Sequence, residues 1–446
     1  MSSHLKVPPR IFLNITMYKF TIEEFRTNLP FFSYFFSTLF MVFFSVQAIH
    51  NWPDRLSQIA ISSACILTTL LVLQKHTSEL IHTKKWLKET KIVFIIMALG
   101  AFNIYFSEDR SASLKGMSLF LMSGILIFFS SFFLFQTRKN QKLFLWLCSL
   151  CFATLIIYGL FEFFQKGVYP EKRILLLATN PIPAGSLLIL LATGPLLLLI
   201  ETKIAWQKLL LSTFLLVGVL VVFLIGQRGP ILALLVMGFI WAATRKRGAF
   251  IFSLIIIFLM GAGYLFRGEI PSHYTNQLLK KETILVRLEF YNVAWQVIQD
   301  KPFFGVGFNT PVRKYVPQNY KPLIYPADSK YTFPSIITGT ETFDNMALFF
   351  LGQTGLLFSG AYGFLIIYLI INLNKRANEN AYIKPQSILL LIVLIGFTAH
   401  SMTFDSLRYP QLNWLFHSLL GLIANCSLLH QEQAKEGFHP GAPISH

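Results

Sequence analysis

Long apolar runs separated by short polar connections recur from one end of the chain to the other. A helix of roughly 17–25 apolar residues crosses a bilayer core of about 30 Å, and the runs divide into about twelve such helices. They are predicted at residues 31–48, 57–73, 91–106, 117–136, 143–164, 184–200, 208–226, 229–243, 248–266, 343–373, 385–400 and 412–429. The run 343–373 contains Gly352, Gly355 and Gly360, so a bent or broken helix is expected there.

The composition excludes a soluble protein. Only 13% of the 446 residues are charged and 54% are hydrophobic, whereas soluble domains carry about 25% charged residues. Because apolar runs fill the whole length, the sequence also excludes a disordered chain and a soluble enzyme with a single N-terminal anchor. The expected fold is therefore that of an all-α polytopic membrane protein.

The net charge of +17 is distributed as a membrane topology would require. With the N-terminus in the cytoplasm, Lys and Arg gather in alternate connections, such as 74–91 and 245–247, and are sparse in the short connections between them. This pattern predicts cytoplasmic N- and C-termini. It also explains most of the positive charge without a nucleic-acid partner.

One connection, residues 267–342, is much longer than an ordinary loop between helices and lies on the predicted outer side. Apolar side chains recur in it at helical spacing, at Ile284, Leu288, Tyr291, Trp295 and Ile298. We expect an amphipathic helix that ends at Lys301-Pro302 within a lid over a site; a passive spacer is the alternative. The chain then divides into transmembrane helices in 1–266, this lid, transmembrane helices in 343–429 and a cytoplasmic tail, 430–446.

Two arginines on the outer side are candidates for anion binding. Arg228 lies in the very short connection between the predicted helices 208–226 and 229–243, at the membrane edge. Placing an arginine there costs free energy unless the residue is paired or functional. Arg287 lies beside the apolar seam of the predicted lid helix. The alternatives are that Arg228 extends to lipid headgroups and that Arg287 is a solvated charge paired with Glu289 or a neighbour. A guanidinium offers paired donors that suit a phosphate, and no Walker or dinucleotide-binding motif competes with this reading.

Other polar groups lie at the same predicted surface. Asp344-Asn345 opens the run 343–373, and Asp344 is either a general base or the cap of a helix N-terminus. His400 and Asp405 lie at the end of the eleventh apolar run, and Glu162 lies near the end of the fifth. Each is either a site residue or only a polar group at the membrane interface. Arg173 and Asn180 precede the sixth run and fit a loop with a helix start equally well. Glu108-Asp109 is a weak metal candidate, because it has neither D-x-D spacing nor a histidine cluster.

Four segments together resemble the O-antigen ligase family, which includes ligases and polymerases of lipid-linked glycans. They are Asn180-Pro181-x-x-Ala184 with the upstream Arg173; Arg228-Gly229; Arg287 followed by Tyr291, Ala294, Ile298, Pro302, Phe304-Gly305 and Gly307; and Asp344-Asn345 followed by Gly355. The last resembles the family's His-Asn and Gly-x-x-Gly pattern. Asp344 replaces the family's histidine, and Phe358 stands at the second glycine, with Gly360 nearby.

The resemblance implies a glycosyltransferase with a GT-C-like membrane fold in the bacterial inner membrane. It would transfer a glycan from undecaprenyl pyrophosphate to an acceptor hydroxyl on the periplasmic face, without a metal, a cofactor or a nucleotide sugar. Arg228 and Arg287, with Arg173, would hold the pyrophosphate, Asp344 would take the acceptor proton, and Asn345 would orient a partner. Asn180, Gly355, His400 and Asp405 would support the site. In-line attack would invert the anomeric centre.

Three functions fit this pattern. In a ligase the acceptor is the lipid A-core, and in a polymerase the acceptor is itself a lipid-linked repeat. The third function, a transporter of the same lipid-linked substrate, would be expected to carry several charges in mid-span. Because mid-span charges are sparse here, the sequence favours a transferase, with the ligase as the leading hypothesis.

Overall fold

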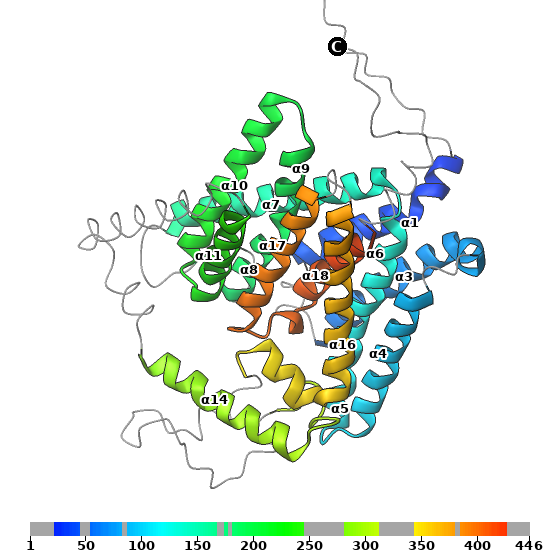
Figure 1. The fold of residues 1–446 in the computed structure, drawn as a ribbon, viewed down its shortest axis with the longest axis vertical. Helices are drawn as coiled ribbons and strands as arrows, with labels where there is room; N and C mark the ends of the chain where they lie inside the picture. Colours follow the sequence, from blue (N-terminus) through cyan, green and yellow to red (C-terminus); the bar gives the residue numbers. More distant parts are fainter. Residues whose placement is uncertain are drawn as a thin grey trace, which may run out of the picture.

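A computed structural model describes residues 22–44, 54–82, 87–166, 174–176, 181–244, 281–311, 343–379 and 384–425. Across these ranges the regular structure is helical, as the apolar pattern predicts (Figure 1). The elements are α1 (Ile22–Leu39), η1 (Phe40–Phe44), α3 (Asp54–His82), α4 (Leu87–Tyr105), α5 (Arg110–Phe120), η3 (Leu121–Leu126), α6 (Ile127–Leu134), α7 (Arg138–Lys166), α8 (Pro181–Leu191), α9 (Thr193–Glu201), α10 (Ala205–Ile225), α11 (Arg228–Ala243), α14 (Lys281–Asp300), α16 (Met346–Glu379), α17 (Lys384–Ser401), η5 (Ser406–Arg408) and α18 (Pro410–Asn425).

Seven helical stretches within the described ranges are long and apolar enough to cross a membrane. They are Gln58–Lys75, Arg110–Leu134, Arg138–Gln165, Pro181–Glu201, Ala205–Ile225, Met346–Asn378 and Lys384–Ser401. Asn28–Phe43, Thr90–Tyr105 and Arg228–Ala243 are shorter apolar helices at three more predicted positions. The predicted helix at 248–266 lies outside the described residues. The chain is a multi-helix membrane protein, and the count of about twelve helices and the GT-C-like assignment remain predictions.

The predicted helix at 412–429 corresponds to α18, which forms the centre of the bundle rather than a lipid-facing span. Nearly all its side chains are buried, including the polar Asn413 and His417. The amide of Asn413 donates to the Phe120 carbonyl at 2.8 Å, where the wide turn η3 begins. A π-turn interrupts the regular hydrogen-bond ladder, so a neighbouring side chain can use the exposed carbonyl. Polar positions of α18 thus join it to the α5–η3–α6 helix.

The predicted helix at 184–200 is two helices, α8 and α9, which meet at Ala192. Pro195 provides the physical reason, because a proline inside a helix cannot donate to the preceding turn. Gly194 then packs directly on α7: a side chain at this position would meet the backbone of Leu145 and Ser149. The helix is therefore interrupted at the point where Gly194 makes its close contact with α7.

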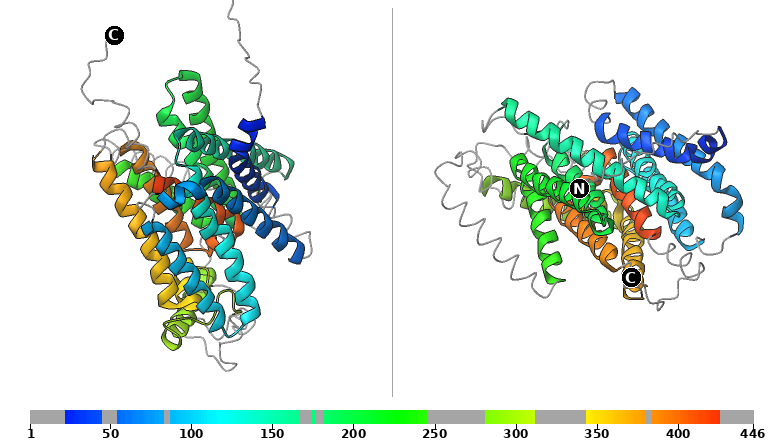
Figure 2. Two further views of the ribbon diagram at one scale, coloured as in Figure 1. Left: turned by 90° about the vertical axis from the view of Figure 1, so that its right-hand side faces the viewer. Right: turned by 90° about the horizontal axis from the view of Figure 1, so that it is seen from above.

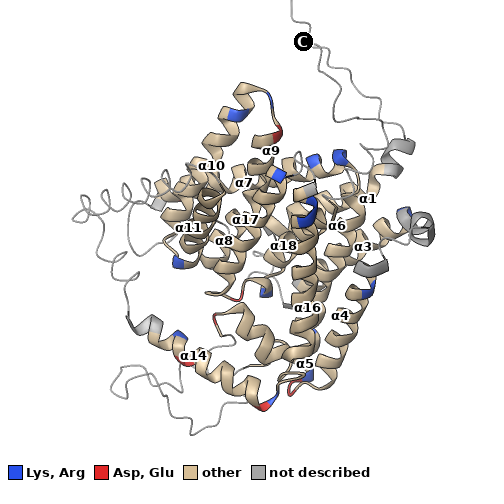
Figure 3. Ribbon diagram, viewed as in Figure 1, with Lys and Arg blue, Asp and Glu red and all other residues tan. Residues whose placement is uncertain are grey.

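Connections predicted to lie on one side of the membrane meet at one end of the bundle. At the end of the bundle where α5 begins, the lower end in Figure 1, the loop before α5 meets the segment after α14. There the Glu108 amide donates to the Val306 carbonyl at 3.0 Å, and Arg408 of η5 donates to the Asn309 side chain at 2.7 Å. At the opposite end, Glu201 accepts from Gln386 at 2.8 Å and pairs with Lys142. Lys and Arg are prominent at this second end (Figure 3). The helix α14 lies across the lower end, against the first part of α16 (Figures 1 and 2).

The expected break in the long helix is found at Gly355, whose φ of 73° and ψ of 177° interrupt α16. The break leaves carbonyls before it and amides after it without helical partners, and the segment after α14 takes them. The amides of Val306 and Gly307 donate to Gly352 and Gln353, while Leu356 donates to the Pro302 carbonyl at 2.7 Å. Backbone hydrogen bonds thus hold the segment after α14 against the kink of α16.

Candidate functional site

Several of the candidate residues that the structure describes lie at or beside one turn, residues 402–405, between α17 and η5. The Met402 carbonyl accepts from the Tyr291 hydroxyl of α14 at 3.3 Å and from the Asn345 side chain at 3.0 Å. The Asp405 carboxylate accepts from the Asn345 amide at 2.9 Å. Gly229, at the start of α11, lies against Thr403. One turn therefore fixes the relative positions of α11, α14 and the start of α16.

Arg287 and Asp344 form an ion pair at this junction. The Arg287 Nε lies 3.4 Å from the Asp344 Oδ2, and about a third of each side chain is exposed. Arg287 projects from α14 and Asp344 from the turn before α16, so the pair joins the lid helix to the kinked helix. Glu289, the other acidic residue considered for Arg287, is buried and accepts from the Asn292 side chain at 3.2 Å.

Asp344 is not the cap of α16. The Asn345 side chain takes that role, because its Oδ1 accepts from the amides of Ala347 at 3.0 Å and Leu348 at 3.1 Å. Asp344 has a left-handed backbone, with a φ of 50°, which is unusual outside glycine and tolerated by aspartate. The turn therefore directs Asp344 to Arg287 while Asn345 holds the backbone. Asn345 thus caps α16 and bonds to Asp405 beside Asp344.

The surroundings of Asp344 change its acidity. Burial raises the pKa of the Asp344 carboxyl above its usual 3.8, and the adjacent Arg287 counteracts part of that rise. Desolvation disfavours the charged carboxylate, whereas a nearby cation favours it. A carboxyl balanced in this way is a better proton acceptor than an ordinary exposed aspartate, and its basicity depends on whether Arg287 stays beside it.

Arg228 belongs to the same electrostatic group. The guanidinium of Arg228 lies within electrostatic range of Arg287. Two guanidinium groups within electrostatic range of one another favour an anion between them. The next residue explains why Arg228 is held there: a side chain at Gly229 would overlap the His400 ring and meet the Thr403 hydroxyl at 2.6 Å. The absence of a side chain lets the start of α11 approach the turn.

His400 supports this approach from inside the bundle. It is buried, its Nε2 is hydrogen-bonded to the Ser186 hydroxyl of α8, and its ring lies beneath Gly229. Pro230 packs against Gly185 of the same α8 helix. His400 therefore lies against Gly229, and Asp405 accepts from the Asn345 amide, so both residues contact segments next to Arg228 and Asp344.

The lid helix exists, but its packed face differs from the expected seam. The helix α14 spans Lys281–Asp300 and ends before Pro302 as predicted. Its buried face is formed by Phe290, Val293, Ala294, Val297 and Ile298. The predicted seam residues Leu288 and Trp295 are 41% and 56% exposed. Ile298 belongs to both sets and is buried, and Tyr291 of the seam packs against the core, so the spacing predicted the packed face only in part.

Other predicted residues take structural roles or lie outside the described ranges. Arg173 and Asn180 are outside them. The Glu162 carboxylate accepts from the amides of Leu175 and Leu176 at 3.1–3.2 Å. Glu108 pairs with Lys301, while the Asp109 side chain accepts from the Ala112 amide at the start of α5. No group of three or more potential metal ligands occurs among the described residues.

Sequence reasoning missed the polar residues that fix the base of the lid. The buried Asn103 of α4 donates to the carbonyls of Phe304 at 2.7 Å and Gln353 at 2.9 Å and accepts from the Phe308 amide at 3.0 Å. The Gln353 side chain bonds both Asn309 and Thr310. The only sequence signal was a lone amide within each of two apolar runs, and neither amide revealed its partner.

Gly355 is also structural. A side chain there would overlap the Phe303 carbonyl and meet the Phe304 amide at 2.5 Å. Gly305, with a φ of 65°, faces the Gln353 backbone equally closely. Two glycines are therefore needed where the segment after α14 touches the kink of α16.

Residues 211–358 match the family model described as O-antigen ligase. A search of curated proteins gives no match to the chain. The matched segment runs from α10 to just beyond the kink of α16, and it includes Arg228, Arg287, Asp344 and Gly355. This membrane protein therefore carries, over residues 211–358, the domain of the O-antigen ligase family.

Proposed function

We propose that the protein is an inverting O-antigen ligase of the bacterial inner membrane. It moves a glycan from undecaprenyl pyrophosphate to a hydroxyl of lipid A-core on the periplasmic face. The observation that carries this proposal is the grouping of Arg287, Asp344 and Arg228 at one turn. A pyrophosphate needs cations, an acceptor hydroxyl needs a base, and the two must lie together for in-line transfer.

The reaction uses these residues in complementary roles. The acceptor oxygen attacks the anomeric carbon, the bond from that carbon to the pyrophosphate oxygen breaks, and the bonding electrons pass to the leaving pyrophosphate. Arg228 and Arg287 stabilise the negative charge that grows there. Asp344 accepts the hydroxyl proton, and later releases it to water. Asn345 and Asp405 keep the turn that holds Asp344 in place.

Donor binding also prepares the base. In the free protein Arg287 contacts Asp344. An arriving pyrophosphate attracts Arg287 and weakens that contact, which makes the buried carboxylate more basic when the acceptor hydroxyl is present. Arg173 and Asn180 are proposed to complete the donor site from the connection before α8.

Transfer by the purified protein in detergent tests the proposal. Lipid-linked glycan and lipid A-core should give a joined product, because no sealed membrane is needed for group transfer. A transporter would give no product under these conditions. A parallel reaction that offers only lipid-linked repeats distinguishes the polymerase, since a ligase should extend lipid A-core and leave the repeats unjoined.

A further inference from the structure

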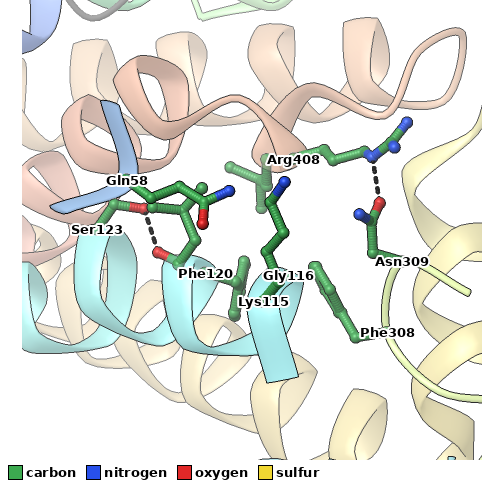
Figure 4. A pocket seen from close by; sticks show the side chains of 10 residues that line it. Gln58, Lys115, Gly116, Phe120, Ser123, Phe308, Asn309 and Arg408 are labelled. Atoms are coloured by element: carbon green, nitrogen blue, oxygen red, sulfur yellow. Dashed lines mark hydrogen bonds between the residues drawn. The ribbon is translucent and has the colours of Figure 1, made fainter. Parts of the chain in front are cut away.

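An open pocket lies near the proposed donor site. Its volume is about 430 Å³, including the solvent at its mouth, and it is lined by residues of α3, α5, η3, the 308–309 turn and η5. Its polar lining residues are Gln58, Lys115, Ser123, Asn309 and Arg408, over the rings of Phe120 and Phe308 (Figure 4). Arg228, Arg287 and Asp344 do not line it. The pocket is therefore distinct from the three residues proposed to perform the transfer.

The lining has the charge of an anion site. Two cations, Lys115 and Arg408, contribute to it, and none of the lining residues described is acidic. Lys115 extends from α5 into the space that the Gln58 amide also faces (Figure 4). An ammonium, a guanidinium and neutral amides are donors that recognise phosphate oxygens.

One wall of the pocket is held in place by specific contacts of Arg408 and Asn309. The Arg408 Nε donates to the Asn309 Oδ1 at 2.7 Å, and the Asn309 amide is held by the Gln353 side chain next to the α16 kink. Asn309 has a left-handed φ of 61°. A side chain at Gly116 would meet the Asn309 Cβ at 2.6 Å, so the glycine lets this turn lie directly on α5. Arg408 is thereby oriented at the rim before any ligand binds.

The pocket and the proposed active site share one short segment. Asp405 accepts from Asn345 beside Asp344, whereas Leu407 and Arg408, two and three residues later, line the pocket. A ligand in the pocket therefore lies next to the turn that positions the proposed base. A transfer between two large substrates needs a second recognition site beside the reacting groups, in addition to the donor site.

We propose that this pocket binds a phosphate group carried by the acceptor glycan, with Lys115 and Arg408 as its cationic contacts. The inference rests on the proposed function, because it assigns the acceptor side of the same reaction. Lys115 supplies affinity from an exposed position, and Arg408 is the oriented partner. Neither residue touches the reacting atoms, so the pocket determines acceptor affinity and not the chemical step.

The test compares acceptor kinetics for the wild type and Lys115→Gln. With saturating donor, the variant should raise the KM for a phosphorylated acceptor about tenfold, as expected for one charge-assisted contact. It should leave kcat and the donor KM within about twofold. Acceptor treated with phosphatase should show the higher KM already with the wild type, with no further rise in the variant. Lys115→Glu should enlarge the effect on the phosphorylated acceptor only.

Arg110→Gln is the matched control. Arg110 is a cation at the start of the same helix, it stacks over the Tyr105 ring, and it does not line the pocket. This variant should keep the wild-type KM for both acceptors. An unchanged KM in Lys115→Gln, or an equal rise for both acceptors, would overturn the inference while wild-type product still supports the proposed function. Absence of product from every wild-type reaction would instead count against the function itself.

Two further measurements distinguish a phosphate of the acceptor glycan from a phosphate of a lipid headgroup. Inorganic phosphate should raise the Tm of the wild type in detergent and raise it less in Lys115→Gln, which reports binding without activity. Acceptor kinetics should then be repeated in nanodiscs of phosphatidylcholine with and without phosphatidylglycerol. If the Lys115→Gln effect appears only with phosphatidylglycerol and is the same for both acceptors, the pocket holds a lipid headgroup and the inference is wrong.

Discussion

The Nε of Arg287 lies 3.4 Å from the Oδ2 of Asp344, across 57 positions of sequence. The contact joins a cation suited to the donor pyrophosphate to a carboxylate suited to the acceptor proton. Because burial raises the pKa of Asp344 and Arg287 opposes that rise, the two proposed roles are coupled through one ion pair. The pair therefore links donor binding to the strength of the base.

The pH dependence of transfer should report Asp344. Only the ionised carboxylate can accept a proton, so the rate should rise with pH through the Asp344 pKa and then level off. Since burial raises that pKa, the acid limb should lie above the usual 3.8 of an aspartate. In Asp344→His the limb should move upward, toward the value of about 6.5 for an imidazole. Initial rates over a pH series check both; identical limbs in the two proteins would exclude Asp344 as the base.

The Asp344→Asn variant should lose transfer activity and still bind the donor. An amide cannot accept the proton, so kcat should fall by about a hundredfold or more. The same change removes the anion that holds Arg287, so the donor should bind at least as tightly as in the wild type. Glu108→Gln is the control, because Glu108 pairs with Lys301 away from the turn. Full activity of Asp344→Asn would remove the base assignment.

Gly355→Ala should destabilise the protein, whereas Gly360→Ala should not. Gly355 has a backbone that other residues rarely adopt, and a methyl group would overlap the Phe303 carbonyl. The expected loss is about 1–3 kcal/mol from backbone strain, with overlap in addition. A methyl group at Gly360 meets nothing within 4 Å, and alanine favours a helix by about 1 kcal/mol over glycine. Thermal unfolding in detergent compares them, and equal midpoints would contradict the role given to the kink.

Gly229→Ala should impair the donor site through the position of Arg228. The added methyl group would overlap the His400 ring, so the start of α11 must move away from the 402–405 turn. The donor KM should rise about tenfold or more, since small displacements of positioning groups are costly. The double variant Gly229→Ala/His400→Ala creates space and should recover part of the loss. A double variant no better than Gly229→Ala would argue against the proposed contact.

The sequence predicted apolar helices where the described ranges hold seven stretches long enough to cross a membrane, the break at Gly355 and an amphipathic helix that ends before Pro302. Each of these depends on local spacing or on a single helix-breaking residue. It predicted the packed face of α14 only in part, since both faces carry apolar side chains. It also did not distinguish Asp344 from Asn345 as the helix cap, because both residue types cap equally well.

The unpredicted part of the site depends on contacts between distant segments. Asn103 bonds backbone groups about 200 and 250 residues later, and Asp405 meets Asn345 from a turn 60 residues beyond it. A lone polar residue in an apolar run shows that a partner is needed and gives no indication of which. The cost of an arginine at a membrane edge is what marked Arg228 as a candidate in the sequence, and its role in the site stays a prediction.

The most direct test of the account is glycan transfer by purified Arg228→Ala and Arg287→Ala in detergent, each compared with the wild type. Both variants should insert and purify normally, because neither side chain is buried in the bundle. Each should abolish the joined product while the wild type forms it, since the pyrophosphate then leaves without its cations. Normal transfer by either variant would contradict the proposed pyrophosphate site.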